Sequence, residues 1–232
     1  MKKIVLSLAV IATMTLASCG NKNADKVTTT TEQEVATEKG EKFNVNLTDS
    51  YVTWKVGHKG GLDPRFGKIS LQSGDIAVDA SGLNAGNYVM DMNTIAVDRE
   101  SVSKDEDVAK LEGHLKNADF FDVEKYPTVA FAITKVEDFD ATKNESKIEG
   151  ANKLVSGNLT ILDNTVNITF PAKVTIADGK TTVEANFVAQ RTDWGIKFGT
   201  VDKTGAAITP AEWGISQDME IGIHLVADKV TE

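Results

Sequence analysis

The chain has 232 residues, a formal net charge of −9 and a single cysteine. A single cysteine excludes an internal disulfide framework, so the folded domain has to be held together by core packing. The acidic balance disfavours nucleic acid and anionic membrane surfaces as partners of the protein.

The first 18 residues have the pattern of an export signal. Two lysines follow Met1, an apolar run extends from Ile4 to Leu16, and the ending Leu-Ala-Ser-Cys19 resembles a bacterial lipobox. The apolar run is too short to span a bilayer. We therefore predict a lipoprotein signal peptide over residues 1–18 and a lipidated Cys19. An ordinary signal peptide with an incidental cysteine is the alternative.

Residues 19–42 comprise this cysteine and a segment that is polar, rich in threonine and glutamate, and without periodicity. Such a composition predicts a flexible, solvated tether. The acyl chains on Cys19 would hold the protein in the cell envelope. In a bacterium with two membranes, we expect the outer membrane, on its periplasmic side or at the surface.

Residues 43–232 alternate apolar and polar positions, as antiparallel strands with one wet face do. The clearest run extends from Val166 to Ile176, and turn signals such as Asp178-Gly179 separate the runs. The segment 103–116 differs: a capping box at its start precedes Val108 and further apolar residues at helical spacing, which predicts one short helix. Many strands with one helix favour a closed barrel, although periodicity alone also fits a sandwich.

The segment 114–131 joins this helix to the next strand. It reads His-Leu-x-x-x-Asp-Phe-Phe-Asp-Val-x-x-Tyr-Pro-x-x-x-Phe. We expect one of the adjacent rings Phe120 and Phe121 to pack under the helix and the other to face the strands' interior. Pro127 favours an extended Tyr126 at the entry to the strand.

This segment resembles the hallmark segment of the YceI-like family of bacterial extracytoplasmic proteins. Two further stretches, Val155–Ile161 and Arg191–Ile196, are similar to elements of the same family. The resemblance implies an all-β fold over residues 43–232, a closed, lipocalin-like antiparallel β-barrel with one short α-helix. It also implies a ligand, because the family binds isoprenoid chains such as polyisoprenoids or isoprenoid quinones.

The sequence carries no motif for catalysis, a metal or a cofactor. His58, His114 and His224 have no partner at metal-ligand spacing, and the nucleophile elbow, P-loop and dinucleotide fingerprint are missing. We therefore predict a protein that is not an enzyme and has no metal or cofactor, apart from a bound isoprenoid lipid. His58 and His114 either are rim histidines satisfied by backbone carbonyls or contact the headgroup of a ligand.

The inward phase of the strands supplies most of the candidate ligand-binding residues, and the helix, the segment after it and the element 191–196 supply His114, Phe121 and Trp194. Small inward residues (Gly157, Ala172, Ala185 and Ala189) suggest that the lumen is not filled by side chains. The candidates are Trp54, Val56, His58, Met90, Met92, His114, Phe121, Phe131, Phe170, Phe187 and Trp194.

Three functions are compatible with this sequence. The first is a lipid-anchored envelope protein that binds an isoprenoid-type chain in its lumen for carriage or sequestration. The second is a side-chain-filled barrel that acts as a structural or partner-binding lipoprotein in envelope stress. The third is an enzyme that uses His58 and His114 on an amphiphile. The resemblance favours the first.

Overall fold

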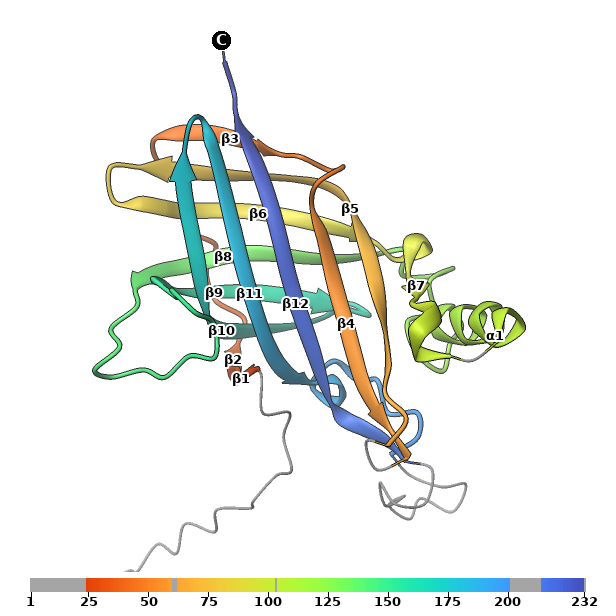
Figure 1. The fold of residues 1–232 in the computed structure, drawn as a ribbon. Helices are drawn as coiled ribbons and strands as arrows, with labels where there is room; N and C mark the ends of the chain where they lie inside the picture. The colour runs from red at the N-terminus through yellow and green to blue at the C-terminus, as the bar shows by residue number, and fades with distance from the viewer. Residues whose placement is uncertain (1–23, 60–61, 103, 201–213, 232) are drawn as a thin grey trace, which may run out of the picture.

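A computed structural model describes residues 24–59, 62–102, 104–200 and 214–231. The predicted signal peptide, Cys19 and Ser103 lie outside these residues. Within the described residues, eight long antiparallel strands close into a barrel (Figure 1). The expected all-β closed barrel is confirmed.

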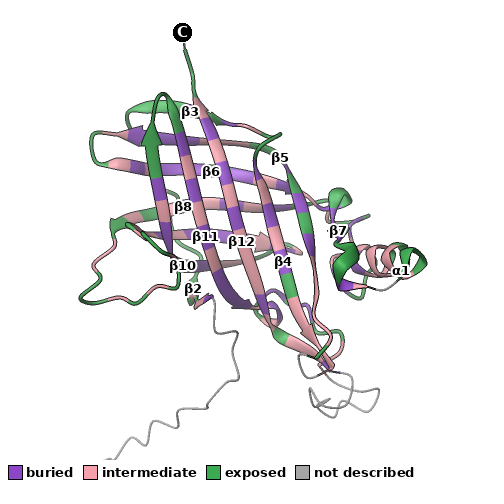
Figure 2. Ribbon diagram, in the orientation of Figure 1, coloured by how far each residue is buried: buried purple, intermediate pink, exposed green. Residues whose placement is uncertain are grey.

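The barrel order is β4–β5–β6–β8–β9–β10–β11–β12, and β12 pairs back on β4. The alternation seen in the sequence appears as alternating burial along the strands (Figure 2). The strands are β4 (Tyr51–His58), β5 (Arg65–Asp79), β6 (Gly82–Asp91), β8 (Thr128–Asp138), β9 (Lys153–Ile161), β10 (Asn164–Ala177), β11 (Lys180–Gln190) and β12 (Ile215–Lys229).

The segment before the barrel is part of the sheet. Strand β1 (Asp25–Lys26) pairs with β11, β2 (Thr28–Thr31) pairs with β10, and β3 (Glu41–Val45) pairs with both β5 and β12. Strands β10 and β11 pair with each other only next to their hairpin, so β1 and β2 fill the gap where the two strands separate.

The expectation of a flexible tether therefore has to be corrected from Ala24 onward. The threonines of β2 are β-branched, which suits a strand, and the edge of β10 offers them a ladder partner. Gln33 extends this attachment: its N–H donates to Asn158 Oδ1 over 3.0 Å, and Asn158 Nδ2 donates to its carbonyl over 2.7 Å. The polar composition of this segment did not reveal that it pairs with the sheet, because edge strands are often polar.

Helix α1 (Asp105–Lys116) lies beside one end of the barrel, next to β7 (Ala96–Val97) (Figure 1). The predicted helix is confirmed, but it starts after Lys104, whose side chain makes no capping hydrogen bond. The acidic residues of its first turn complement the helix dipole. The short 3-10 helices η2 (Met92–Thr94), η3 (Arg99–Ser101) and η4 (Arg191–Trp194) lie in the connections. No helix among the described residues is long and apolar enough to cross a membrane.

Candidate functional site: an apolar cavity in the barrel

One half of the barrel is hollow. A cavity of about 1090 Å³ extends inward from the end where α1 and η4 lie. We call this part the hollow half. Its inner wall is apolar and comes from all eight barrel strands. The inner wall consists of Val52, Trp54, Val56, Ile69, Tyr88, Met90, Val129, Phe131, Leu159, Ile161, Ile168, Phe187, Met219, Ile221 and Ile223, with Ile215 toward the mouth.

The opposite half is filled by side chains, and we call it the filled half. Phe170 stacks on Phe187 with ring centroids 4.4 Å apart, and Phe131 lies 5.8 Å from Phe170 and 5.2 Å from Tyr88. The pocket in this half measures only about 20 Å³. The ring cluster therefore forms the floor of the cavity, with Phe131 and Phe187 at the boundary.

Most of the candidate residues lie where the sequence places them. Those that line the cavity are Trp54, Val56, His58, Met90, Met92, His114, Phe121, Phe131 and Phe187. Two do not line it. Phe170 lies behind Phe187 in the filled half, and Trp194 is completely buried, its indole Nε1 donating to the Leu159 carbonyl over 2.8 Å.

The small inward residues do not create the cavity, which corrects the sequence argument. Gly157, Ala172, Ala185 and Ala189 are all absent from its lining. A Cβ on Gly157 would lie 2.1 Å from Cζ of Phe131, so the missing side chain makes room for this ring. Strand periodicity shows which residues face inward, but it does not show how far along the barrel axis the rings fill the interior.

The mouth of the cavity is formed by α1 and the segment after it. Phe120 is buried and packs edge-on against His114 at 5.0 Å, whereas Phe121 is half-buried; both line the cavity. Phe120 therefore packs against the helix as expected for one of the two rings, but both rings line the cavity, so the expected division between them is not observed. His114 Nε2 lies 3.0 Å from Asp119 Oδ2, so a carboxylate and not a backbone carbonyl satisfies this rim histidine.

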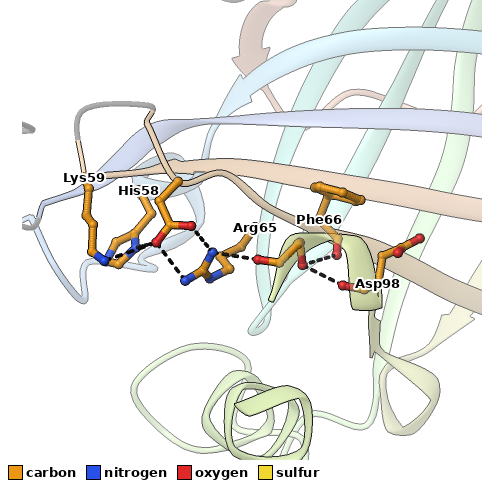
Figure 3. A network of polar contacts seen from close by, with 7 residues as sticks. His58, Lys59, Arg65, Phe66 and Asp98 are labelled. Atoms are coloured by element: carbon orange, nitrogen blue, oxygen red, sulfur yellow. Dashed lines mark hydrogen bonds and ion pairs between the residues drawn. The ribbon is translucent and has the colours of Figure 1, made fainter. Parts of the chain in front are cut away.

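A polar network joins two loops at the mouth (Figure 3). Asp63 accepts hydrogen bonds from both terminal nitrogens of Arg65 and forms an ion pair with Lys59 at 3.2 Å. Arg65 Nη1 also donates to the Ser101 carbonyl over 2.7 Å, which fixes the loop before β5 to η3. The hydrogen bond from Arg65 lowers the pKa of Asp63.

His58 stands at the end of β4 beside this network (Figure 3), with Nδ1 3.7 Å from Asp63 Oδ2. Burial, together with the positive charge of Arg65, lowers the pKa of His58 below 6.5. The imidazole is therefore held in its neutral form at neutral pH, when it offers one donor and one acceptor.

Arg191 also lines the cavity, and it was not among the residues expected there from the sequence. It was noted only as the first residue of a family-like element, yet its side chain is 2% exposed and lines the cavity. Its guanidinium donates to the carbonyls of Ser216, Ile196 and Ile215 over 2.8, 2.8 and 3.0 Å. Burial lowers its pKa to about 10, so it stays charged at neutral pH. One feature of the sequence could have indicated this burial: Arg191 follows directly after a strand whose alternate residues face inward.

The described residues contain no group of three or more His, Cys, Asp or Glu side chains that could hold a metal ion. His58 and His114 both line the mouth, each next to its own aspartate. This arrangement provides polar contacts at the entrance of an apolar cavity.

Comparison with known sequences gives the family. Residues 43–227 match the profile of the YceI-like domain. Among curated relatives, a UPF0312 protein of Shewanella baltica is 31% identical over 111 residues, 47% of this chain and 49% of the relative. The chain thus spans about half the length of this relative. A UPF0312 protein of Shewanella oneidensis is 29% identical over 185 residues, which are 78% of this chain and 80% of the relative.

Solved structures share the fold. BcnA of Burkholderia cenocepacia superposes with a TM-score of 0.56 at 18% identity, covering 78% of this chain and 98% of BcnA. A polyisoprenoid binding domain from Saccharophagus degradans, implicated in plant cell wall breakdown, gives 0.55 at 12% identity, covering 85% of this chain and 100% of that domain. The profile match covers most of the chain and these structures have the same barrel; the chain belongs to the YceI-like domain family.

Proposed function

We propose that the protein binds a long apolar chain of the isoprenoid type in the hollow half of its barrel, and that it carries or sequesters this lipid at the cell envelope. The cavity of about 1090 Å³ with its apolar inner wall is the observation that carries the proposal. It exceeds the usual range of small-molecule pockets, roughly 300–1,000 Å³. The polyisoprenoid binding domain from Saccharophagus degradans, which has the same fold, supports the choice of ligand class.

The size of the cavity limits the chain that fits. A methylene group takes about as much volume as a water molecule does in the liquid, roughly 30 Å³. The cavity of about 1090 Å³ therefore holds on the order of 36 carbons, or about seven isoprene units. Each buried methylene contributes about 0.8 kcal/mol, against an association cost of roughly 4–15 kcal/mol. Very short chains should therefore bind weakly. A barrel filled by its own side chains, the alternative function, does not account for this volume.

Native mass spectrometry of the protein purified under mild conditions, followed by lipid extraction, tests the ligand class. We expect a mass increment that is removed by organic extraction and identified as a prenyl lipid. A protein that arrives without lipid and that takes up no geranylgeraniol or solanesol in titrations would contradict the proposal.

We also propose that acylated Cys19 anchors the protein to the membrane. More than one acyl chain is needed for stable anchoring, and lipoprotein processing supplies several. Cys19→Ala should abolish metabolic labelling with a fatty acid and transfer the protein from the detergent phase to the aqueous phase. Unchanged labelling and partitioning of this variant would refute the anchor.

A further inference from the structure

The charge of the cavity lining differs in sign from the charge of the whole protein. Five lysine and arginine residues and three acidic residues line the cavity, which leaves a surplus of two positive charges in a chain whose net charge is −9. The lining residues with a charge are Lys59, Arg65, Arg99, Lys110 and Arg191 on the basic side and Asp63, Glu100 and Asp107 on the acidic side.

Four of the five basic residues face a carboxylate. Lys59 and Arg65 pair with Asp63. Arg99 Nη1 lies 3.0 Å from Asp105 Oδ1, and Lys110 Nζ lies 3.8 Å from Asp107 Oδ1. Within the part of the chain that the structure describes, no carboxylate pairs with Arg191, which is also the most deeply buried of the five.

The contacts of Arg191 neither neutralise its positive charge nor use all of its N–H donors. A guanidinium has five N–H groups, and three of them donate to neutral carbonyls. Carbonyl dipoles stabilise the cation but do not cancel its charge, and an uncompensated buried charge is costly. One N–H remains on each terminal nitrogen of a side chain that lines the cavity.

We propose that Arg191 is the docking point for an anionic headgroup, a phosphate ester or a carboxylate, on the lipid that occupies the cavity. The headgroup lies against Arg191 between η4 and the mouth, and the apolar tail extends toward the floor formed by Phe131 and Phe187. This rests on the proposed function and adds the chemical class of the headgroup. The acidic outer surface does not oppose it, because the headgroup meets the lining and not the surface.

The experiment compares ligands that share one tail. Geranylgeraniol, geranylgeranyl monophosphate and geranylgeranoic acid are titrated into the delipidated full chain, with inorganic phosphate alone as a fourth probe. Hydrogen bonds to a buried charge predict that at least one anionic ligand binds about tenfold to 100-fold more tightly than the alcohol. The phosphate and the acid distinguish the two sources of charge, and inorganic phosphate should not bind measurably.

Variants then locate the effect. Arg191→Met should bring the affinity for the anionic ligands down to that for the alcohol, whereas Arg191→Lys should keep part of the preference. Lys135→Gln removes a charge outside the cavity and should keep the preference within about twofold, since screened surface charges contribute little. Arg99→Gln removes an exposed charge of the lining at the mouth and should lose clearly less of the preference than Arg191→Met does.

The outcomes are separable. If no ligand of the series binds, the proposed function fails. If the alcohol and the anions bind wild type equally well, the proposed function stands and the headgroup site at Arg191 is refuted. This comparison does not require an Arg191 variant that folds. If Arg99→Gln loses the preference as fully as Arg191→Met does, the effect is the general charge of the mouth, and the assignment to Arg191 is wrong.

Discussion

The filled half and the hollow half of the barrel are built from the same strands, yet only one half holds a cavity. In the filled half, Phe170 and Phe187 stack across the interior and the ring of Phe131 occupies the space that Gly157 leaves. In the hollow half, mainly aliphatic residues and methionines line the wall together with Trp54 and Tyr88, and α1 with Phe120 and Phe121 stands at the mouth. Ring packing therefore fills the first half, whereas the second half keeps an unfilled apolar volume.

The largest effect on stability is expected in the filled half. Phe170→Ala removes a ring that is 2% exposed, so it should lower the free energy of unfolding by about 3–5 kcal/mol. Phe121→Ala, at the mouth, removes a half-buried ring and should cost clearly less. Urea denaturation of both variants measures the difference. Equal losses for the two variants would mean that the two halves do not differ in packing.

A single methyl group tests the fit of the ring cluster. Gly157→Ala places a Cβ against Phe131 and the Ala132 carbonyl, and overpacking of this kind costs about 1–3 kcal/mol. The matched control is Gly113→Ala in α1, where a Cβ meets nothing within 4 Å. Alanine should stabilise the helix there by up to about 1 kcal/mol. If Gly157→Ala melts at or above the wild-type temperature, the ring does not fill this space.

Filling the hollow half should affect binding more than folding. Val129 is buried on β8 and lines the cavity. Val129→Phe directs a larger side chain into empty space, so the unfolding free energy should change by less than about 1.5 kcal/mol. The affinity for geranylgeraniol should fall at least tenfold, which corresponds to about 1.4 kcal/mol. A stable variant that binds as tightly as wild type would show that the ligand does not use this volume.

The smallest effect concerns pH at the mouth. Burial lowers the pKa of His58 below 6.5, so the folded state binds fewer protons at this site than the unfolded state. Stability from this site is therefore complete above pH 6.5 and is lost as the pH falls below it. His58→Gln should flatten this part of the dependence of melting temperature on pH. A variant whose melting temperature falls as steeply as that of wild type between pH 7 and pH 5 would assign the effect to other groups.

The sequence was informative about strands and faces because alternation follows directly from strand geometry. It placed Trp54, Met90 and Phe131 on the inner side, where the structure has them. It failed for Phe170, since period two does not encode depth along the barrel axis, and for Trp194, which lies in η4 and not on a strand. Sequence reasoning also treated Arg191 only as part of a motif. The burial of its charge depends on contact between η4 and β12, which the sequence pattern does not contain.

The segment that was predicted to be a tether shows a second limit of prediction from sequence. Composition predicted a solvated segment over residues 19–42, but β1 and β2 complete the sheet where β10 and β11 separate. Whether a polar segment pairs with a sheet depends on an available edge elsewhere in the chain. A local reading of Thr28–Thr31 does not contain this information.

The dependence of affinity on chain length tests most directly whether the hollow half takes up an apolar chain. Trp54 lines the cavity, so ligand titrations with prenyl alcohols, from farnesol through geranylgeraniol to solanesol and longer polyprenols, can be followed by its fluorescence, with Trp54→Phe as the control. We predict an affinity that rises with length and levels off near about seven isoprene units, when the volume is used up. An affinity that is independent of length would contradict binding in the hollow half.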